Sequence, residues 1–225
     1  WLPGSSRSLD EWIPVCAEMG RYRGKTYGLA ATTNCKLIAF NKKIVREAGL
    51  DPDSPPQNAE ELRRWNEAMT IYEDGTYKRV GFIPQSLELW AYAFGGQWYD
   101  RETGRITADH PGNLAALRWL ASWARSANAL AMQRFEQTAS GNIVSANGPF
   151  LLGKLAMVGT GDWFGALMRQ YGDDIEWGYT GFNGLAEGGR RNVSDINGSV
   201  FVIPSASTRK KEAWEFLNWI CGPDG

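Results

Sequence analysis

The chain has 225 residues, of which 43% are hydrophobic and 22% are charged, a composition typical of a folded globular protein rather than a disordered one. Its 24 basic and 25 acidic residues give a formal net charge of -1. This balance argues against a nucleic-acid-binding surface and against a polybasic membrane binder, so we predict no nucleic-acid partner.

The beginning of the chain predicts two short strands and a helix. Residues 26–30 and 35–40 have the apolar and aromatic content of strands, and they flank a polar tip that contains Thr33 and Asn34. Residues 44–48 favour a short helix that ends at a glycine, and a proline-rich loop follows it.

The middle of the chain predicts two longer helices around a strand. Asn58 and Glu61 have the spacing of a helix capping box, and apolar residues follow with helical spacing. Residues 80–84 favour a strand, and a second helix begins at Pro111, since proline is favoured in the first turn. The expected inward side chains of this second helix are Leu114, Leu117, Leu120 and Trp123.

The end of the chain predicts three strands and two helices. The strands are expected at residues 155–158, 177–182 and 200–203. Asp162 can cap a helix over residues 163–171. A last amphipathic helix is expected to bury Ala213, Phe216, Leu217 and Ile220. Strands that alternate with helices in this way indicate an α/β fold with a largely buried sheet.

The sequence offers little material for metal or disulfide chemistry. Cys16, Cys35 and Cys221 are widely spaced without a CxxC motif, and His110 is the single histidine. We therefore predict no metal, no cofactor and no disulfide framework. The first residues lack the basic and apolar regions of a signal peptide, so we expect an intracellular chain or a mature or excised piece.

Several motifs occur together in the order found in one protein family. In sequence they are GKTYGL at 24–29, FNK at 40–42, AGLD at 48–51, FLLGKLAM at 150–157, GDW at 161–163 and AWEFL at 213–217. In this order and spacing they resemble the bacterial extracellular solute-binding proteins for sugars, the maltose-binding-protein-like group that serves ABC importers. The resemblance covers most of the chain.

The resemblance implies a periplasmic-binding-protein-like α/β fold of type II, with a three-layer α/β/α lobe in an incomplete two-lobed architecture. Residues 1–31 would be the end of a first-lobe segment and the first crossover between lobes. Residues 32–195 would be the second lobe, and residues 196–225 the return crossover with a first-lobe strand and helix. The remainder of the first lobe would be absent, which makes the chain a fragment.

Trp163 is the strongest candidate for ligand contact. The chain has 11 tryptophans, and a flat indole suits both core packing and the apolar face of a sugar ring. Trp163 follows a strand and begins a helix, the place where α/β sheets bind ligands, and family members often put an aromatic residue there. Asp162 could accept sugar hydroxyls or only cap its helix, and Phe164 could be a second stacking face or a core residue.

Six further candidates come from two regions. Family members place ligand-facing residues in the segment that here contains Gln85, Glu88 and Trp90. Polar residues near the expected crossovers could bind hydroxyls or simply occupy turns, and these are Thr33, Asn34 and Asn197. Trp65, Trp119, Trp123, Trp214 and Trp219 lie on or beside helical stripes, so we interpret them as packing residues.

Other functional classes are weaker. The glycines of residues 159–165 lie between a strand and a helix, as in a dinucleotide loop, but the third glycine comes one position late and two bulky aromatics intervene. Glu88 and Asp162 could be the paired carboxylates of a glycoside-processing enzyme, although no motif ties them together. A ligand-sensing ectodomain without transport is a further alternative.

We therefore predict a receptor and not an enzyme. Its function would be the binding of a sugar or oligosaccharide in a cleft between lobes, by aromatic stacking and hydroxyl hydrogen bonds, for delivery to the membrane permease of an ABC importer. The intact protein would be extracytoplasmic, either periplasmic or anchored to the cell surface as a lipoprotein. A fragment of it would expose apolar interface surface, so self-association is expected.

Overall fold

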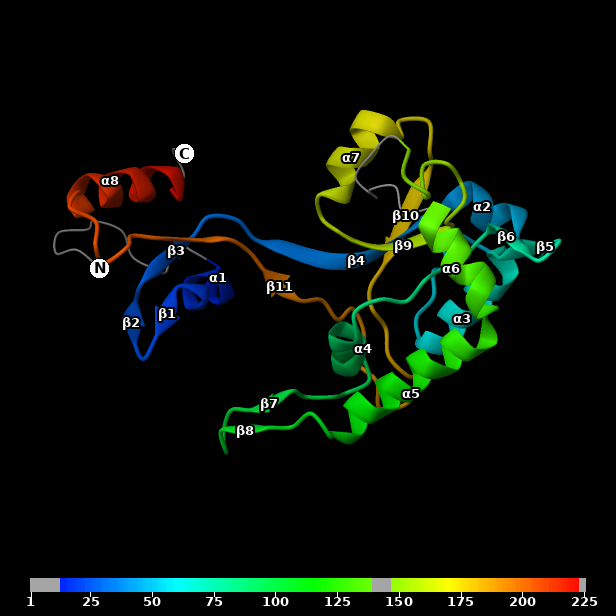
Figure 1. Cartoon of the computed structure of the whole chain (residues 1–225), viewed down its shortest axis with the longest axis horizontal. Helices are drawn as coiled ribbons and strands as arrows, with labels where there is room; N and C mark the ends of the chain where they lie inside the picture. The colour runs from blue at the N-terminus through cyan, green and yellow to red at the C-terminus, as the bar shows by residue number, and fades with distance from the viewer. Residues whose placement is uncertain (1–12, 139–146, 223–225) are drawn as a thin grey trace. The chain divides into compact units, whose positions relative to one another are not determined.

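The computed structural model describes residues 13–138 and 147–222, which form two compact units (Figure 1). The larger unit comprises residues 36–195, and the smaller unit joins residues 13–35 to residues 196–222. Residues 1–12 of the predicted first segment and residues 223–225 of the predicted last segment lie outside the described residues.

The larger unit is built on a sheet whose central strand is β4 (Asn34–Asn41). β9 (Met157–Gly161) and β10 (Trp177–Thr180) both pair with β4, and both pairings are antiparallel. In the pairing with β9, Lys36 lies opposite Gly161. The predicted strand at 35–40 is therefore confirmed. The strand predicted at 177–182 is present but ends at Thr180, and the strand predicted at 155–158 begins two residues later than expected.

Helices cover both faces of this sheet. Successive residues of β4 alternate between two hydrophobic clusters, with Ile38 and Phe40 in one and Ala39 in the other. The first cluster also takes residues from α2 (Lys42–Glu47), α3 (Ala59–Met69), α4 (Leu87–Ala93) and α5 (Pro111–Ser126). The second takes residues from α6 (Ala129–Thr138) and α7 (Phe164–Tyr171). Figure 1 shows α7 on one side of the sheet and α3, α4 and α5 on the other, the three-layer α/β/α arrangement that was predicted.

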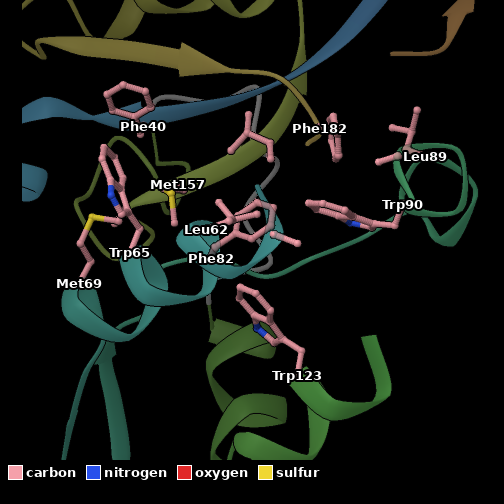
Figure 2. Close-up of a cluster of buried hydrophobic side chains, with 14 of the residues drawn as sticks. Phe40, Leu62, Trp65, Met69, Phe82, Leu89, Trp90, Trp123, Met157 and Phe182 are labelled. Carbon is pink, nitrogen blue, oxygen red and sulfur yellow. The ribbon is translucent and has the colours of Figure 1, made fainter. Parts of the chain in front are cut away.

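The first cluster is rich in aromatic side chains (Figure 2). Phe40 and Trp65 pack edge to face with ring centroids 5.4 Å apart, and Phe82 and Trp123 do so at 6.0 Å. Edge-to-face pairs of this kind are a favoured geometry for packed aromatic rings. The apolar residues that follow the capping box with helical spacing are buried in α3, as their pattern predicts: Leu62, Trp65 and Met69.

The predicted helix starts are also confirmed. Asn58 Oδ1 accepts a hydrogen bond from the Glu61 backbone N–H at 2.9 Å, and the Glu61 carboxylate accepts one from the Gln57 backbone N–H at 2.8 Å. α5 begins with Pro111, and the imidazole Nδ1 of His110 accepts the Gly112 backbone N–H at 3.1 Å. These bonds satisfy donors that a helix start leaves without intrahelical partners.

The predicted inward stripe of α5 is partly wrong. Leu114 and Leu117 are 37% and 49% exposed, whereas Asn113, Ala116 and Trp123 are buried. Residues at steps of three drift backward around a helix of 3.6 residues per turn, so a long series at this spacing cannot stay on one face. The series therefore reaches the core at Trp123 but lies at the surface at Leu114 and Leu117, nearer the N-terminal end of α5.

Two other elements of the larger unit differ from expectation or were not expected. Residues 80–84 form no strand, and Val80 makes a single parallel bridge to Leu155. A turn at Asp74 and Gly75 joins a hairpin of β5 (Ile71–Glu73) and β6 (Thr76–Arg79). The polar turn after Asp100 joins a second hairpin, β7 (Tyr99–Asp100) and β8 (Arg105–Ile106).

The smaller unit contains short strands and two helices. Its elements are α1 (Pro14–Met19), β1 (Arg21–Tyr22), β2 (Lys25–Thr26), β3 (Gly28–Ala30), β11 (Ile196–Asn197), β12 (Val200–Val202) and α8 (Lys210–Ile220). β12 pairs antiparallel with β3, and β11 pairs antiparallel with Asn34 and Cys35 at the start of β4. The prediction that α8 buries Phe216 is wrong, because Leu217 is its buried residue and Phe216, at the edge of the stripe, is 55% exposed.

Candidate functional site

The larger unit contains a cavity of about 440 Å³ beside the end of β9. Its polar and charged lining residues are Lys36, Gln85, Ser86, Thr160 and Asp195. Its apolar lining residues are Phe82, Leu89, Gly159, Trp163 and Phe182. A mostly apolar surface with a few polar groups is the usual lining of a small-molecule site.

Trp163 stands at the start of α7, directly after β9. Its backbone N–H donates a hydrogen bond to Asp162 Oδ1 at 3.0 Å, and its side chain is 38% exposed. The six-membered ring of the indole lies against the Cα of Gly161, where no side chain intervenes. The Lys36 ammonium nitrogen lies 4.4 Å from the centroid of the Trp163 ring. The indole therefore lines the cavity while remaining open to solvent.

A second part of the lining comes from the segment that enters α4. Gln85 and Ser86 are exposed, and Ser86 has a φ of 62°, in the left-handed region that non-glycine residues rarely adopt. The side chain of Ser86 makes no capping hydrogen bond to α4, so its hydroxyl stays available on the cavity wall.

Buried apolar side chains form the remaining lining. Leu89 and Phe182 are 3% and 4% exposed, and Figure 2 shows them beside Trp90 at one end of the first hydrophobic cluster. Thr160 on β9 is buried and adds a hydroxyl to this lining. Lys36 and Asp195 carry opposite charges, so the charged groups of the lining balance.

Of the predicted site residues, Trp163 and Gln85 are brought together by this cavity. Asp162 and Glu88 are exposed neighbours of lining residues but are not themselves in the lining. The Asp162 carboxylate accepts the Trp163 backbone N–H, but Trp163 is the N-cap of α7 and the helix has no side-chain capping hydrogen bond, so the predicted capping by Asp162 is wrong. The paired-carboxylate alternative has no support from these positions.

Two predicted contacts are corrected by burial. Trp90 is fully buried, with ring centroids 4.5 Å from Trp119 and 5.2 Å from Phe182. Phe164 is 1% exposed and packs edge to face against Phe150 and Trp177. Side chains enclosed in this way offer no face to a ligand, so both belong to the core.

Thr33, Asn34 and Asn197 lie in the smaller unit. Asn34 and Asn197 are register partners in the pairing of β4 with β11. Thr33 is an exposed residue before β4. Ligand contact by these three residues stays a prediction.

Five lining residues were not predicted from the sequence, namely Lys36, Ser86, Thr160, Phe182 and Asp195. Lys36 can be recognised as a lining residue only when its pairing with Gly161 in the β4–β9 register is known. The sequence alone does not determine this register. Nothing in the sequence distinguishes Phe182 from other core aromatic residues, or Thr160 from other residues of a strand.

Within the described residues, no cluster of three or more His, Cys, Asp or Glu side chains is arranged to hold a metal ion. In that same part of the chain, every helix is too short or too polar to cross a bilayer.

Comparison with known proteins identifies relatives along most of the chain. A maltotriose-binding protein of Pyrococcus abyssi is 25% identical over 94% of this chain and 43% of its own length. A lactose-binding protein of Rhizobium radiobacter is 32% identical over 99% of this chain and 53% of its own length. The chain thus spans about half the length of these relatives, which are solute-binding proteins rather than enzymes.

Solved structures give the same result. CpMnBP1 with mannotriose bound superposes with a TM-score of 0.83 at 30% identity, over 94% of this chain and 55% of that protein. A solute-binding protein from Thermotoga lettingae, bound with α-D-tagatose, shares the fold with a TM-score of 0.72 at 24% identity. The sequence model of the bacterial extracellular solute-binding protein family matches residues 10–225, and this chain therefore belongs to that family.

Proposed function

We propose that this chain is the sugar-binding part of a substrate-binding protein of an ABC importer, and that the cavity of the larger unit holds a sugar or oligosaccharide. The observation that carries the proposal is a partly exposed indole, Trp163, beside a cavity with an apolar lining and a few polar groups. The names of the relatives, which refer to maltotriose, lactose and mannotriose, support this ligand class.

Trp163 would stack on the apolar C–H face of a sugar ring. If ligand covers half of an indole surface of roughly 150–250 Å², burial contributes about 2–3 kcal/mol. Micromolar affinity requires about 8 kcal/mol, so hydroxyl hydrogen bonds must supply orientation and most of the rest. Gln85, Ser86 and Thr160 carry amide and hydroxyl groups suited to that role.

The chain would act within a longer, two-lobed protein. In this proposal residues 32–195 form the second lobe, and residues 1–31 and 196–225 belong to the crossovers and the first lobe. Support comes from the relatives, of which the chain covers about half. Hinge closure around the ligand would present the closed form to a membrane permease. The protein would act outside the cytoplasm, in the periplasm or anchored to the cell surface.

Calorimetric titration of the full-length protein with mono- and oligosaccharides tests this function. We expect one class of sugar to bind and Trp163→Ala to weaken it by about 30-fold or more, with thermal unfolding still cooperative. Tyr179→Ala, at an exposed aromatic residue on β10, is the matched control and should keep the wild-type affinity. Unchanged affinity in Trp163→Ala would remove the indole from the site, and no binding by any sugar would overturn the proposal.

A further inference from the structure

We propose that Gly161 and Lys36 fix the orientation of the Trp163 indole, and that both are positioning residues for the sugar site. This inference rests on the proposed function, because it assigns to the indole a ligand-stacking role. It concerns how the stacking plane is held in place before ligand arrives.

The indole of Trp163 occupies the space that a side chain at position 161 would fill. A Cβ built on Gly161 would fall on Cε3, Cζ3 and Cη2 of Trp163. These atoms belong to a side chain, and Gly161 does not have a φ in the left-handed region, so alanine is compatible with the backbone there. An added methyl group would therefore displace the indole and leave the strand intact.

Lys36 supplies the second constraint. Strand pairing sets Lys36 opposite Gly161, so the lysine rises from the sheet next to the place where the indole lies. Its ammonium nitrogen is 4.4 Å from the ring centroid, within the range at which a cation is attracted to the negative face of an indole. A tryptophan at a helix start has several staggered rotamers, and this contact favours one of them.

The two constraints act on the ligand-free protein. A stacking plane that is already oriented loses less conformational freedom when a sugar binds, which raises affinity without a new contact to the sugar. The proposal therefore assigns two roles: Trp163 stacks on the ligand, and Gly161 and Lys36, although Lys36 also lines the cavity, orient Trp163.

The test uses the 225-residue chain labelled with 5-fluorotryptophan and observed by 19F NMR without ligand. The Trp163 resonance is assigned by its loss in Trp163→Phe. We expect Gly161→Ala and Lys36→Met to shift or broaden this resonance, and Lys36→Arg to keep it near its wild-type position, since arginine also stacks on aromatic faces. Gly165→Ala is the control, because its Cβ would meet Arg169 at an ordinary 3.8 Å.

The affinity of the full-length protein for the sugar found by calorimetry provides the second measurement. We expect a loss of about two- to fivefold in Lys36→Met and of about tenfold or more in Gly161→Ala, with cooperative unfolding in both. An unshifted Trp163 resonance in Gly161→Ala and Lys36→Met would overturn the proposal, as would weaker binding in Lys36→Met without a change in that resonance. If no sugar binds, the proposed function fails, and the ligand-free spectra still decide whether the two residues orient the indole.

Discussion

The first hydrophobic cluster contains fully buried side chains whose contribution to stability can be tested one residue at a time. Met69 is fully buried in the first hydrophobic cluster, which also contains Trp65 and Leu62 from the same helix. Truncation to alanine leaves a cavity in addition to losing the transfer free energy of the removed atoms. We expect Met69→Ala to lower the free energy of unfolding by about 2–5 kcal/mol, measured by urea denaturation.

The control for this prediction is Leu152→Ala. Leu152 is 53% exposed in the turn before β9, so its truncation should change the free energy of unfolding by no more than about 0.5 kcal/mol. Equal losses in the two variants would contradict the assignment of Met69 to the core.

At this scale the sequence predicted part of the candidate site. Trp163 and Gln85 were found from the family resemblance and from the position of Trp163 between a strand and a helix, and both line the cavity. Trp90 and Phe164 were also predicted to contact ligand, although both are buried in the core. An aromatic residue looks the same in the sequence whether it lines a cavity or packs in a core. Only three-dimensional packing distinguishes the two environments.

At the scale of elements, the start of α3 can be tested directly. The side chain of Asn58 accepts the Glu61 backbone N–H and its amide donates to the Glu61 carboxylate at 2.9 Å. Removing an N-cap acceptor leaves a helix donor without its partner. We expect Asn58→Ala to lower the free energy of unfolding by about 1 kcal/mol, whereas Glu67→Ala, at an exposed position of the same helix, should cause no loss.

An ion pair joins α2 to the residue before β10. The Arg46 guanidinium donates two hydrogen bonds, of 2.7 and 2.8 Å, to the Glu176 carboxylate, and Lys42 lies 3.9 Å from it. The hydrogen bonds from Arg46 hold the pKa of Glu176 below its ordinary value. A carboxyl whose pKa is lower in the folded state stabilises the fold above its unfolded pKa, and this contribution is lost as the pH falls through the folded pKa.

This sign gives a pH-dependent prediction. We expect Glu176→Gln to be less stable than the wild type at neutral pH and to equal it in acid, once the wild-type carboxyl is protonated. The effect should be small and should weaken with salt, because both side chains are half exposed. Urea midpoints across the acid range measure it. Glu187→Gln, at an exposed carboxylate, serves as the control, and a difference that persists in acid would contradict the linkage.

Elements were predicted best where a local signal fixes them. The cap at Asn58, the start of α5 at Pro111 and the strand at 35–40 were predicted from short-range chemistry. The stripe of α5 failed because its leucines recur every three residues, a spacing that does not match the helix period. Residues 80–84 have strand composition but make one bridge, since pairing depends on a distant partner, Leu155.

At the scale of the whole molecule, the order of the motifs identified the fold. Motifs of the family lie in both compact units, and the sequence model of the family matches residues 10–225. The arrangement of strands around β4 joins residues more than a hundred positions apart, and no local pattern encodes such pairing. The family resemblance therefore predicted the fold, whereas sequence periodicity could not predict this long-range strand pairing.

The smaller unit presents many apolar side chains to solvent in the described part of the chain. Those exposed by 41% or more are Ile13, Tyr22, Tyr27, Ile196, Phe201, Val202, Phe216 and Trp219. Single exposed apolar residues are ordinary, but this number on so small a unit favours association with another apolar surface. We expect the 225-residue chain alone to self-associate, with a sedimentation coefficient that rises with protein concentration.

α8 allows this association to be tested. Phe216 and Trp219 lie three residues apart on its exposed side, with ring centroids 6.1 Å apart, while Leu217 faces inward. The double variant Phe216→Glu and Trp219→Glu should reduce the concentration dependence, because charge opposes burial of this side. Leu130→Glu with Gln133→Glu places the same charges with the same spacing on exposed positions of α6 and should leave it unchanged. Equal effects in the two double variants would assign the association to net charge rather than to the apolar side of α8.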